Sequence, residues 1–322
     1  MNKSEIRKDY FKDEYVIIAP KRAKRPHKAD ANREPEKACF FCPQNFSDEI
    51  ITYEDNNAKG DWEIISVINK FAALSTDNPR AFGQAEVIIE TRQHGLDIND
   101  FSTNHIIRIF DAYIDRFEYL RNMDGVKHVI LFKNEGGKAG ASIAHTHSQI
   151  MALPLLPPKV QAEASAYNKY RLDKCTCPYC DIIKEETDKP RVIWEDENLF
   201  VLAPYASDSP YGAWFIPKRH LRLVSELTRG EKESFAKAMK VVLGILDELA
   251  ISYNYFIENA VNCEDYHMHI KLSPRPNVWA GLELGTGVII NPIPPEYAAK
   301  LYRGEIKIQD DPSRSGHIKV SM

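Results

Sequence analysis

The sequence lacks the features that would place it in a membrane or along a nucleic acid. No segment approaches 18 consecutive apolar residues, and the N-terminus has no apolar signal core. Lysine and arginine number 42 against 46 aspartates and glutamates, a net charge of −4, and they form no long basic run. These absences argue against membrane and nucleic-acid partners, and we expect a cytoplasmic protein.

Cysteine is also scarce, with six residues in a chain of 322. Five of the six gather in two short stretches, "CFFC" at 39–42 and "CTCPYC" at 175–180. In a cytoplasmic chain of this length, such clusters favour metal or redox chemistry over structural disulfides. The length itself predicts about two domains, or one core built twice.

Hydrophobic patterns recur in the same order in the two halves. Each half offers strand-like runs, then an amphipathic helix, then another strand that leads to a His-x-His motif. The segments are 62–74, 85–91, 99–121 and 128–134 in the first half, and 191–204, 212–220, 235–249 and 253–259 in the second. We therefore predict a duplicated α+β unit, divided into residues 1–157 and 158–322.

Two cysteines and two histidines also follow the same order in each half. A Cys-x2-Cys comes first, a single histidine follows, and the first histidine of the His-x-His closes the set. The sets are Cys39, Cys42, His94 and His145, and Cys177, Cys180, His220 and His267. Thiolate and imidazole groups suit Zn2+, and four protein ligands make a closed structural site. The sequence predicts two structural zinc ions per chain.

Two alternatives compete with zinc. Either set alone would suit small buried cysteines beside unrelated histidines, and only the repeated order favours a metal. The tetrapeptide "CPYC" (177–180) is also the active-site sequence of glutaredoxins. Here it precedes a strand pattern instead of opening the helix of a βαβ unit, and "CFFC" has no proline. The redox hypothesis is therefore the weaker one.

The stretch "GASIAHTHSQIMALP" (140–154) alternates like a strand, which places His145, His147 and Gln149 on one face. If His145 binds metal, His147 is either a core histidine or a reactive one. The glycine-rich loop 136–142 can bring backbone N–H groups to an anion, and the Gln149 amide can donate to an anionic oxygen. A neutral imidazole can attack phosphorus. We predict a covalent phosphoryl or nucleotidyl site with His147 and Gln149 as catalytic residues.

Together these motifs resemble the galactose-1-phosphate uridylyltransferase family of the histidine-triad superfamily, over nearly the whole chain. The resemblance is carried by "YVIIAPKRAKRP" (15–26), "INKFAAL" (68–74) and "NEGGKAGASIAHTHSQ" (134–149). It implies two antiparallel-sheet halves, each with a long helix, and zinc on the first Cys/His set. It also implies the substrate-binding residues Arg22, Arg25, Asn69, Phe71, Asn134, Gly140, Ser142 and Glu283.

The resemblance implies a ping-pong nucleotidyltransferase. His147 would attack a nucleotide sugar, release sugar 1-phosphate, and pass the nucleotidyl group to a second phosphate. Gln149 stands where histidine-triad hydrolases usually carry a third histidine, and it favours transfer over hydrolysis. The family also implies a homodimer.

Some residues depart from the uridylyltransferase pattern. The usual His-Pro-His is His-Thr-His, Lys70 replaces an aspartate, and segment 277–303 is more similar to the ADP-glucose phosphorylase branch. That branch uses inorganic phosphate and adenine nucleotides, so an ADP-sugar phosphorylase is the alternative. A nucleotide-binding module without turnover is a further one. In the second half, Lys271 replaces the glutamine and no glycine loop precedes His269, which predicts a decayed copy that keeps its metal.

Overall fold

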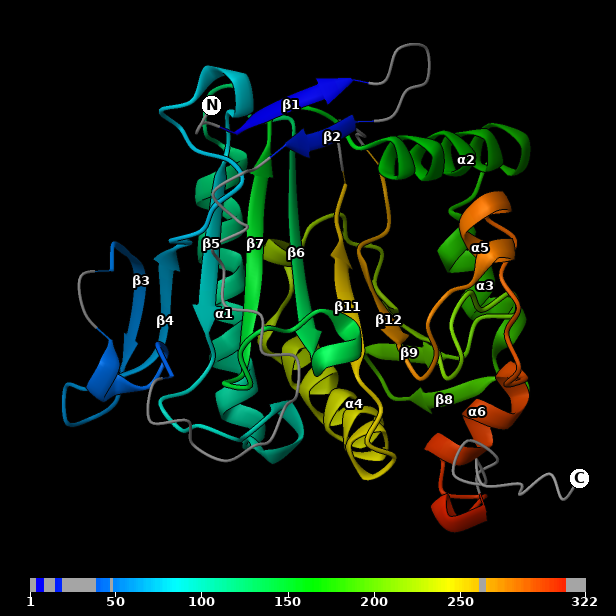
Figure 1. Cartoon of the computed structure of the whole chain (residues 1–322). Helices are drawn as coiled ribbons and strands as arrows, with labels where there is room; N and C mark the ends of the chain where they lie inside the picture. Colours follow the sequence, from blue (N-terminus) through cyan, green and yellow to red (C-terminus); the bar gives the residue numbers. More distant parts are fainter. Residues whose placement is uncertain (1–3, 9–14, 19–38, 47–48, 261–264, 311–322) are drawn as a thin grey trace, which may run out of the picture.

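The two halves of the chain build one continuous antiparallel sheet. The structure is a computed structural model, and it describes residues 4–8, 15–18, 39–46, 49–260 and 265–310. Ten strands form the sheet in the order β3-β4-β5-β7-β6-β11-β12-β10-β9-β8 (Figure 1). They are β3 (Ile51–Asn56), β4 (Trp62–Ile68), β5 (Gln84–Ile89), β6 (His128–Glu135), β7 (His147–Leu153), β8 (Val192–Glu195), β9 (Leu199–Leu202), β10 (Ala213–Pro217), β11 (Tyr253–Glu258) and β12 (His269–Pro274).

The strand order shows the duplication directly. From each outer edge to the centre the first half runs β3-β4-β5-β7-β6 and the second β8-β9-β10-β12-β11, which is the same order of connection. The halves meet where β6 and β11 pair antiparallel, with Phe132 opposite Phe256. The predicted α+β class with two antiparallel halves is confirmed, although the two half-sheets are joined through backbone hydrogen bonds into one.

Two long helices cover one face of this sheet. They are α1 (Thr103–Arg121) and α4 (Arg229–Glu248), which contact each other behind the strands (Figure 1). Each begins at a hydroxyl cap, Ser102 for α1 and Thr228 for α4, whose side chain accepts from a backbone N–H in the first turn. Their apolar faces and the sheet form the main core, in which Phe110 and Phe235 pack with ring centroids 5.6 Å apart.

The predicted elements agree with the structure where the apolar periodicity is strong. The helices predicted in 99–121 and 235–249 are α1 and α4. A separate two-stranded sheet is formed by β1 (Glu5–Lys8) and β2 (Tyr15–Ile18). The strand predicted over 62–74 ends at Ile68, where a turn begins.

Several short elements had no counterpart in the sequence-based prediction. They are β3, α2 (Pro158–Lys174), α3 (Pro178–Glu186), α5 (Gly281–Thr286) and α6 (Pro295–Tyr302). Helix α2 buries a single residue, Tyr167, so its sequence carries no apolar stripe. Within the described residues, no helix is both long and apolar enough to cross a membrane.

Candidate active site and metal centres

The predicted catalytic stretch alternates between two environments. Strand β7 begins at His147, and the residues before it form the loop that includes the 3-10 turn Gly137–Ala139. His147 and Gln149 line a pocket on one face of the sheet. Thr146 and Ser148 point to the opposite face, where they bond to Glu90. The predicted period of two is confirmed for this stretch.

The first Cys/His set converges on one point. Cys39 and Cys42 come from the loop before β3, His94 from the loop after β5, and His145 from the residue pair before β7. The Nδ1 of His145 lies 3.8 Å from the Cys39 Sγ and 3.7 Å from the Cys42 Sγ. The Nδ1 of His94 lies 3.6 Å from the Cys42 Sγ. All four potential ligand atoms lie within 4.8 Å of one another, so the set could hold a metal ion.

The second set has the same geometry. The Nδ1 of His267 lies 3.6 Å from the Cys177 Sγ and 3.5 Å from the Cys180 Sγ, and the Nδ1 of His220 lies 3.5 Å from the Cys180 Sγ. A tetrahedral ion at about 2.3 Å from sulfur and about 2.0–2.1 Å from nitrogen separates the two ligand atoms by roughly 3.6 Å. Both sets fit that geometry, because their sulfur–nitrogen distances lie between 3.5 and 3.8 Å.

Hydrogen bonds from the far side of each imidazole fix the ring orientation. His145 Nε2 donates to the Thr91 carbonyl at 2.7 Å, and His267 Nε2 donates to the Pro217 carbonyl at 2.8 Å. His220 Nε2 lies 2.6 Å from the Asp265 carboxylate. Such partners keep the Nδ1 lone pair facing the thiolates, as in known metal sites.

The sequence pattern did not predict the helix that follows Cys177, although this helix does not belong to a βαβ unit, as expected. Cys177 caps the N-terminus of α3 and Pro178 occupies its first turn, so the tetrapeptide does open a helix. That helix leads into β8 at the edge of the sheet and is not the crossover of a βαβ unit. The sulfur atoms of Cys177 and Cys180 both point at the Nδ1 of His267, as the ligands of one metal ion would.

His147 is held as a neutral imidazole with one nitrogen free. Its Nδ1–H donates to the His145 carbonyl at 2.8 Å, which leaves the lone pair on Nε2. Burial lowers the pKa of His147 to about 4, since the charged form loses its hydration. The Phe41 ring packs edge-on against the imidazole with centroids 5.1 Å apart. The imidazole is therefore unprotonated at neutral pH and oriented by its backbone bond.

The pocket beside His147 is largely apolar. It encloses about 250 Å³ between the "CFFC" loop, the turn after β4 and strands β5 and β7. Four predicted residues line it together with His147: Gln149, Asn69, Phe71 and Ser142. The residues that sequence reasoning missed are mostly its walls: Phe40, Phe41, Phe46, Glu49, Val67, Ile68, Val87 and Ile143. The two phenylalanines inside the first Cys-x2-Cys were the available signal for that wall.

Three other predicted substrate residues, Asn134, Gly140 and Glu283, are not among the residues that line this pocket. The Asn134 side chain accepts from the Asn254 amide at 2.8 Å, and Gly140 ends the loop turn at φ +86°. Glu283 caps its own helix α5 by accepting from the Ala280 N–H at 3.0 Å. Arg22 and Arg25 lie outside the described residues. The roles of all of these residues stay predictions.

The equivalent place in the second half is filled. His269 donates through Nδ1 to the His267 carbonyl at 2.8 Å, as His147 does to His145. The Tyr179 ring lies 4.1 Å from its imidazole, centroid to centroid, and the Glu163 carboxylate lies 4.0 Å from its Nε2. Lys271, at the position of Gln149, binds Glu163 at 2.5 Å. Helix α2 thus places a carboxylate where the first half has open space.

Comparisons with known proteins found relatives over most of the chain. Residues 22–156 match the family described as the N-terminal domain of DUF4931, a domain of unknown function. A galactose-1-phosphate uridylyltransferase from Thermotoga maritima is 29% identical, over 93% of this chain and 98% of the relative. An ADP-glucose phosphorylase from Arabidopsis thaliana is 30% identical, over 93% and 92%. The crystal structure of an Arabidopsis thaliana ADP-glucose phosphorylase with bound ADP-glucose superimposes with a TM-score of 0.77, at 29% identity, covering 94% of this chain and 99% of that one.

The relatives define the class of this chain as a nucleotidyl-transferring enzyme. Within that class, the chain belongs to the galactose-1-phosphate uridylyltransferase family, and it shares features with the ADP-glucose phosphorylase branch.

Proposed function

We propose that the protein is a hexose-1-phosphate uridylyltransferase-like enzyme that acts through a nucleotidyl-His147 intermediate. The observation that carries the proposal is the free Nε2 of a neutral, buried His147 at the wall of an apolar pocket. Phenylalanine and valine side chains suit the flat face of a nucleobase, and the imidazole and amide lie where its phosphates would reach.

The first half-reaction forms one bond and breaks one. The His147 Nε2 lone pair attacks the α-phosphorus of a nucleotide sugar, and the bond from that phosphorus to the bridging oxygen breaks. Sugar 1-phosphate leaves with the electron pair. The Nδ1–H, held by the His145 carbonyl, accommodates the positive charge that develops on the ring. In the second half-reaction a phosphate oxygen of the acceptor attacks the same phosphorus, and the N–P bond breaks.

Gln149 supports this chemistry as a neutral donor. Its side chain is buried in the pocket wall beside His147. An amide N–H that meets a non-bridging phosphate oxygen stabilises the charge of the transition state. An amide has no titrating proton to exchange with water, so it cannot activate water for hydrolysis. From the resemblance to the family we assign phosphate contacts to Gly140 and Ser142 of the loop, to Asn134, and to Arg22 and Arg25.

We further propose that both Cys2His2 sets bind Zn2+ as structural ions. Bound zinc would tie the loops that carry Cys39 and His94 to His145, two residues from the nucleophile. Thiolate ligands persist in a reducing cytoplasm, where we place the protein. The first half, residues 1–157, would carry the chemistry, and residues 158–322 would retain only the metal.

A second candidate is an ADP-sugar phosphorylase, with inorganic phosphate as the acceptor. The 30% identity to the plant ADP-glucose phosphorylase favours it, together with the similarity of segment 277–303 to that branch. Both candidates share the His147 intermediate and differ in the base and the acceptor.

We also propose a homodimer. A run of apolar side chains is exposed around α5, where a partner would cover it. These residues are Val278, Trp279, Leu282, Leu284, Val288 and Ile290. Light scattering on the purified protein tests this proposal, and a monomer at micromolar concentration would refute it.

Intact-protein mass spectrometry at neutral pH tests the reaction. We expect a uridylyl adduct after mixing with UDP-glucose, and no adduct in His147→Asn. The matched control is His269→Asn, which makes the same change in the second half and should keep the adduct. An adenylyl adduct with ADP-glucose would select the phosphorylase, and binding of both nucleotides without any adduct would leave a binding module.

A further inference from the structure

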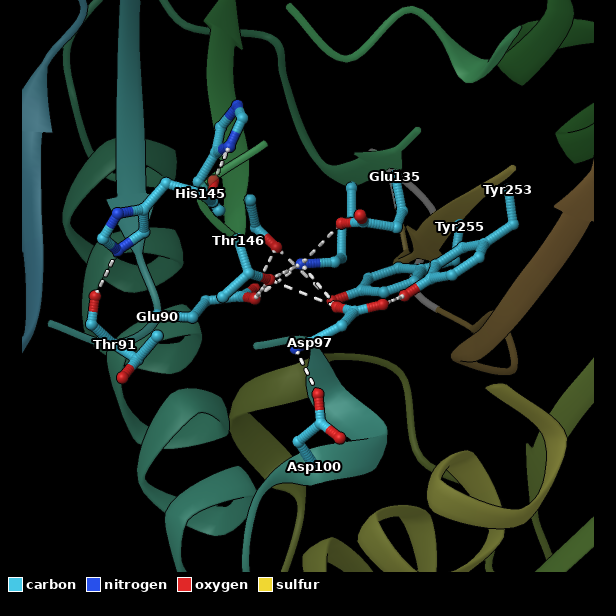
Figure 2. A network of polar contacts seen from close by, with 12 residues as sticks. Glu90, Thr91, Asp97, Asp100, Glu135, His145, Thr146, Tyr253 and Tyr255 are labelled. Atoms are coloured by element: carbon cyan, nitrogen blue, oxygen red, sulfur yellow. Dashed lines mark hydrogen bonds and ion pairs between the residues drawn. The ribbon is translucent and has the colours of Figure 1, made fainter. Parts of the chain in front are cut away.

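A buried group of charged and polar side chains lies directly behind the catalytic strand. At its centre is Lys133 of β6, whose side chain is fully buried. Its ammonium lies 2.7 Å from the Glu90 carboxylate and 3.3 Å from that of Asp97, and it donates to the Thr146 hydroxyl. Figure 2 shows Glu90, Asp97 and Thr146 converging there. We call Glu90, Asp97, Lys133, Thr146 and Ser148 the Lys133 network.

The second half of the chain completes this network. The hydroxyl of Tyr253 donates to Asp97 at 2.6 Å, and that of Tyr255 lies 2.7 Å from the Tyr113 hydroxyl of helix α1 (Figure 2). Tyr113 in turn donates to Glu90 at 2.6 Å. Tyr253 and Tyr255 come from β11, the strand that pairs with β6. The network therefore joins strands of both halves to α1.

Every residue from 145 to 148 is anchored by at least one hydrogen bond of its side chain. His145 bonds to the Thr91 carbonyl. Thr146 accepts from Lys133, and its hydroxyl lies 2.9 Å from Glu90 and 3.2 Å from Asp97. Ser148 donates to Glu90 at 2.5 Å. The peptide between residues 145 and 146, whose carbonyl holds the Nδ1–H of His147, is thus fixed at both ends.

Glu90 and Lys133 both keep their charges in the folded state. Burial opposes ionisation of Glu90, but the Lys133 ammonium and the hydrogen bonds from Lys133, Ser148 and Tyr113 outweigh it and lower its pKa. Burial likewise opposes the charge on Lys133, and the carboxylates of Glu90 and Asp97 raise its pKa in spite of it. A charged lysine without exposure persists only when such partners compensate it.

The second half provides an internal comparison. In the first half Lys133 is paired with Ser148, one residue after the nucleophile; in the second Ile257 is paired with Ile270, one residue after His269. Met268 stands where Thr146 does. Ile257, Met268 and Ile270 all lie in the apolar core, yet the second metal set is as well formed as the first. Neither the fold nor the metal geometry requires a polar network at these positions.

We propose that Thr146, held by Lys133, Glu90 and Asp97, is the positioning residue that orients His147 for attack. The network fixes the His145 carbonyl, the carbonyl fixes the Nδ1–H of His147, and the Nε2 lone pair is thereby aimed into the pocket. The carboxylates of Glu90, Asp97 and Glu135 all lie near one ammonium. The excess of negative charge behind the ring favours the positively charged imidazole of the intermediate. This inference rests on the proposed function.

Thr146→Val tests the positioning role, because it keeps the shape and removes the hydroxyl. We expect the rate of His147 nucleotidylation at saturating nucleotide sugar to fall between about 10- and 100-fold, with unchanged KM and metal content. Thr146→Ser should restore most of the rate. The matched control is Ser66→Ala, which also removes a buried hydroxyl. The Ser66 hydroxyl donates at 3.0 Å to Glu86 of β5, which forms a separate ion pair with Arg116 of α1. Ser66→Ala should stay within about twofold of the parent rate.

A second measurement does not depend on turnover. In a histidine-15N-labelled protein, the His147 signal, assigned by its loss in His147→Asn, reports which ring nitrogen carries the proton. We expect a single Nδ1–H tautomer in the parent and Ser66→Ala, and a mixture in Thr146→Val. A parent-like rate and tautomer in Thr146→Val would overturn the inference, as would an equal rate loss in Ser66→Ala. If the parent forms no adduct with any nucleotide sugar, the proposed function fails, and the tautomer comparison alone decides the positioning role.

Discussion

The two halves of this chain share a scaffold and differ in what surrounds one histidine. Each has the same strand order, a long helix and a Cys2His2 set. In each, the second histidine of the His-x-His donates to the carbonyl of the first at 2.8 Å. Burial lowers the pKa of His147 to about 4 and that of His269 to about 3, so both rings are neutral. Ionisation therefore does not distinguish the halves.

Access and support do distinguish them. His147 lines a pocket, whereas His269 packs against aromatic rings and Glu163. Behind His147 lies the Lys133 network, and behind His269 an apolar core. The Cys2His2 set and the paired histidines occur in both halves and are therefore part of the repeated folding unit. The open pocket and the polar support are additions specific to the first half.

Breaking each metal set separately should have the largest effect on this comparison. Cys39→Ser and Cys177→Ser should each lower the zinc content from two ions to one, because a tetrahedral structural site needs its four ligands. We expect Cys39→Ser to reduce nucleotidylation by more than about 100-fold, since His145 loses its anchor beside His147. Cys177→Ser should lower the Tm by a similar amount but keep the rate per folded molecule within a few-fold.

Elemental analysis, scanning calorimetry and the adduct assay on the same preparations check this prediction. Equal loss of activity in both variants would mean that the second metal serves the reaction and not only the fold.

We expect an intermediate effect on the nucleotidylation rate at Gln149, which lies two residues after His147. Lys271 holds the equivalent position after His269 in the second half. Gln149→Met removes the neutral donor in the pocket, and we expect the rate to fall about 100-fold, as for loss of one oxyanion donor. Lys271→Met makes the equivalent change in the second half and should leave the rate unchanged. Single-turnover kinetics measures both. A rate in Gln149→Met near that of the parent would remove Gln149 from the catalytic residues.

The smallest effect concerns Glu163, which fills the second site, and its contribution to the free energy of unfolding at different pH values. Burial opposes ionisation of Glu163, but the Lys271 ammonium and the hydrogen bonds from Lys271 and the Tyr266 hydroxyl outweigh it and lower its pKa to about 2. Because the folded protein holds this proton more weakly than the unfolded chain, the carboxylate stabilises the fold above pH about 4.5. That contribution is lost as the pH falls towards about 2.

Glu163→Gln should therefore be less stable than the parent at pH 7 by at most about 3 kcal/mol, and the gap should narrow below pH about 4.5. Denaturant unfolding of both proteins at each pH checks this. The parent and variant share their metal sites, so loss of zinc at low pH affects both curves alike. A gap that does not change with pH would show that folding leaves the pKa of Glu163 at its value in the unfolded chain.

Local patterns predicted the parts of the molecule that depend on spacing. The repeated order of cysteine and histidine identified two sets of four residues, and each set converges in space. The order repeats because each half places its four residues at the same positions of the same fold. The alternation of residues 145–149 gave the pocket face, and three- and four-residue spacing gave α1 and α4. Helix α2 escaped prediction because a helix that buries one tyrosine has no apolar stripe.

Contacts between distant segments were beyond such patterns. Lys133 lies in the apolar run "HVILFKN", and nothing in that run says that Glu90, 43 residues away, neutralises it. Glu163 reaches Lys271 across 108 residues of sequence to fill the second site. Spacing along the chain was enough to predict the duplication, the two Cys2His2 sets and His147 as the candidate nucleophile. Only the tertiary structure decided which histidine is open and which is supported, because that depends on what packs against each strand face.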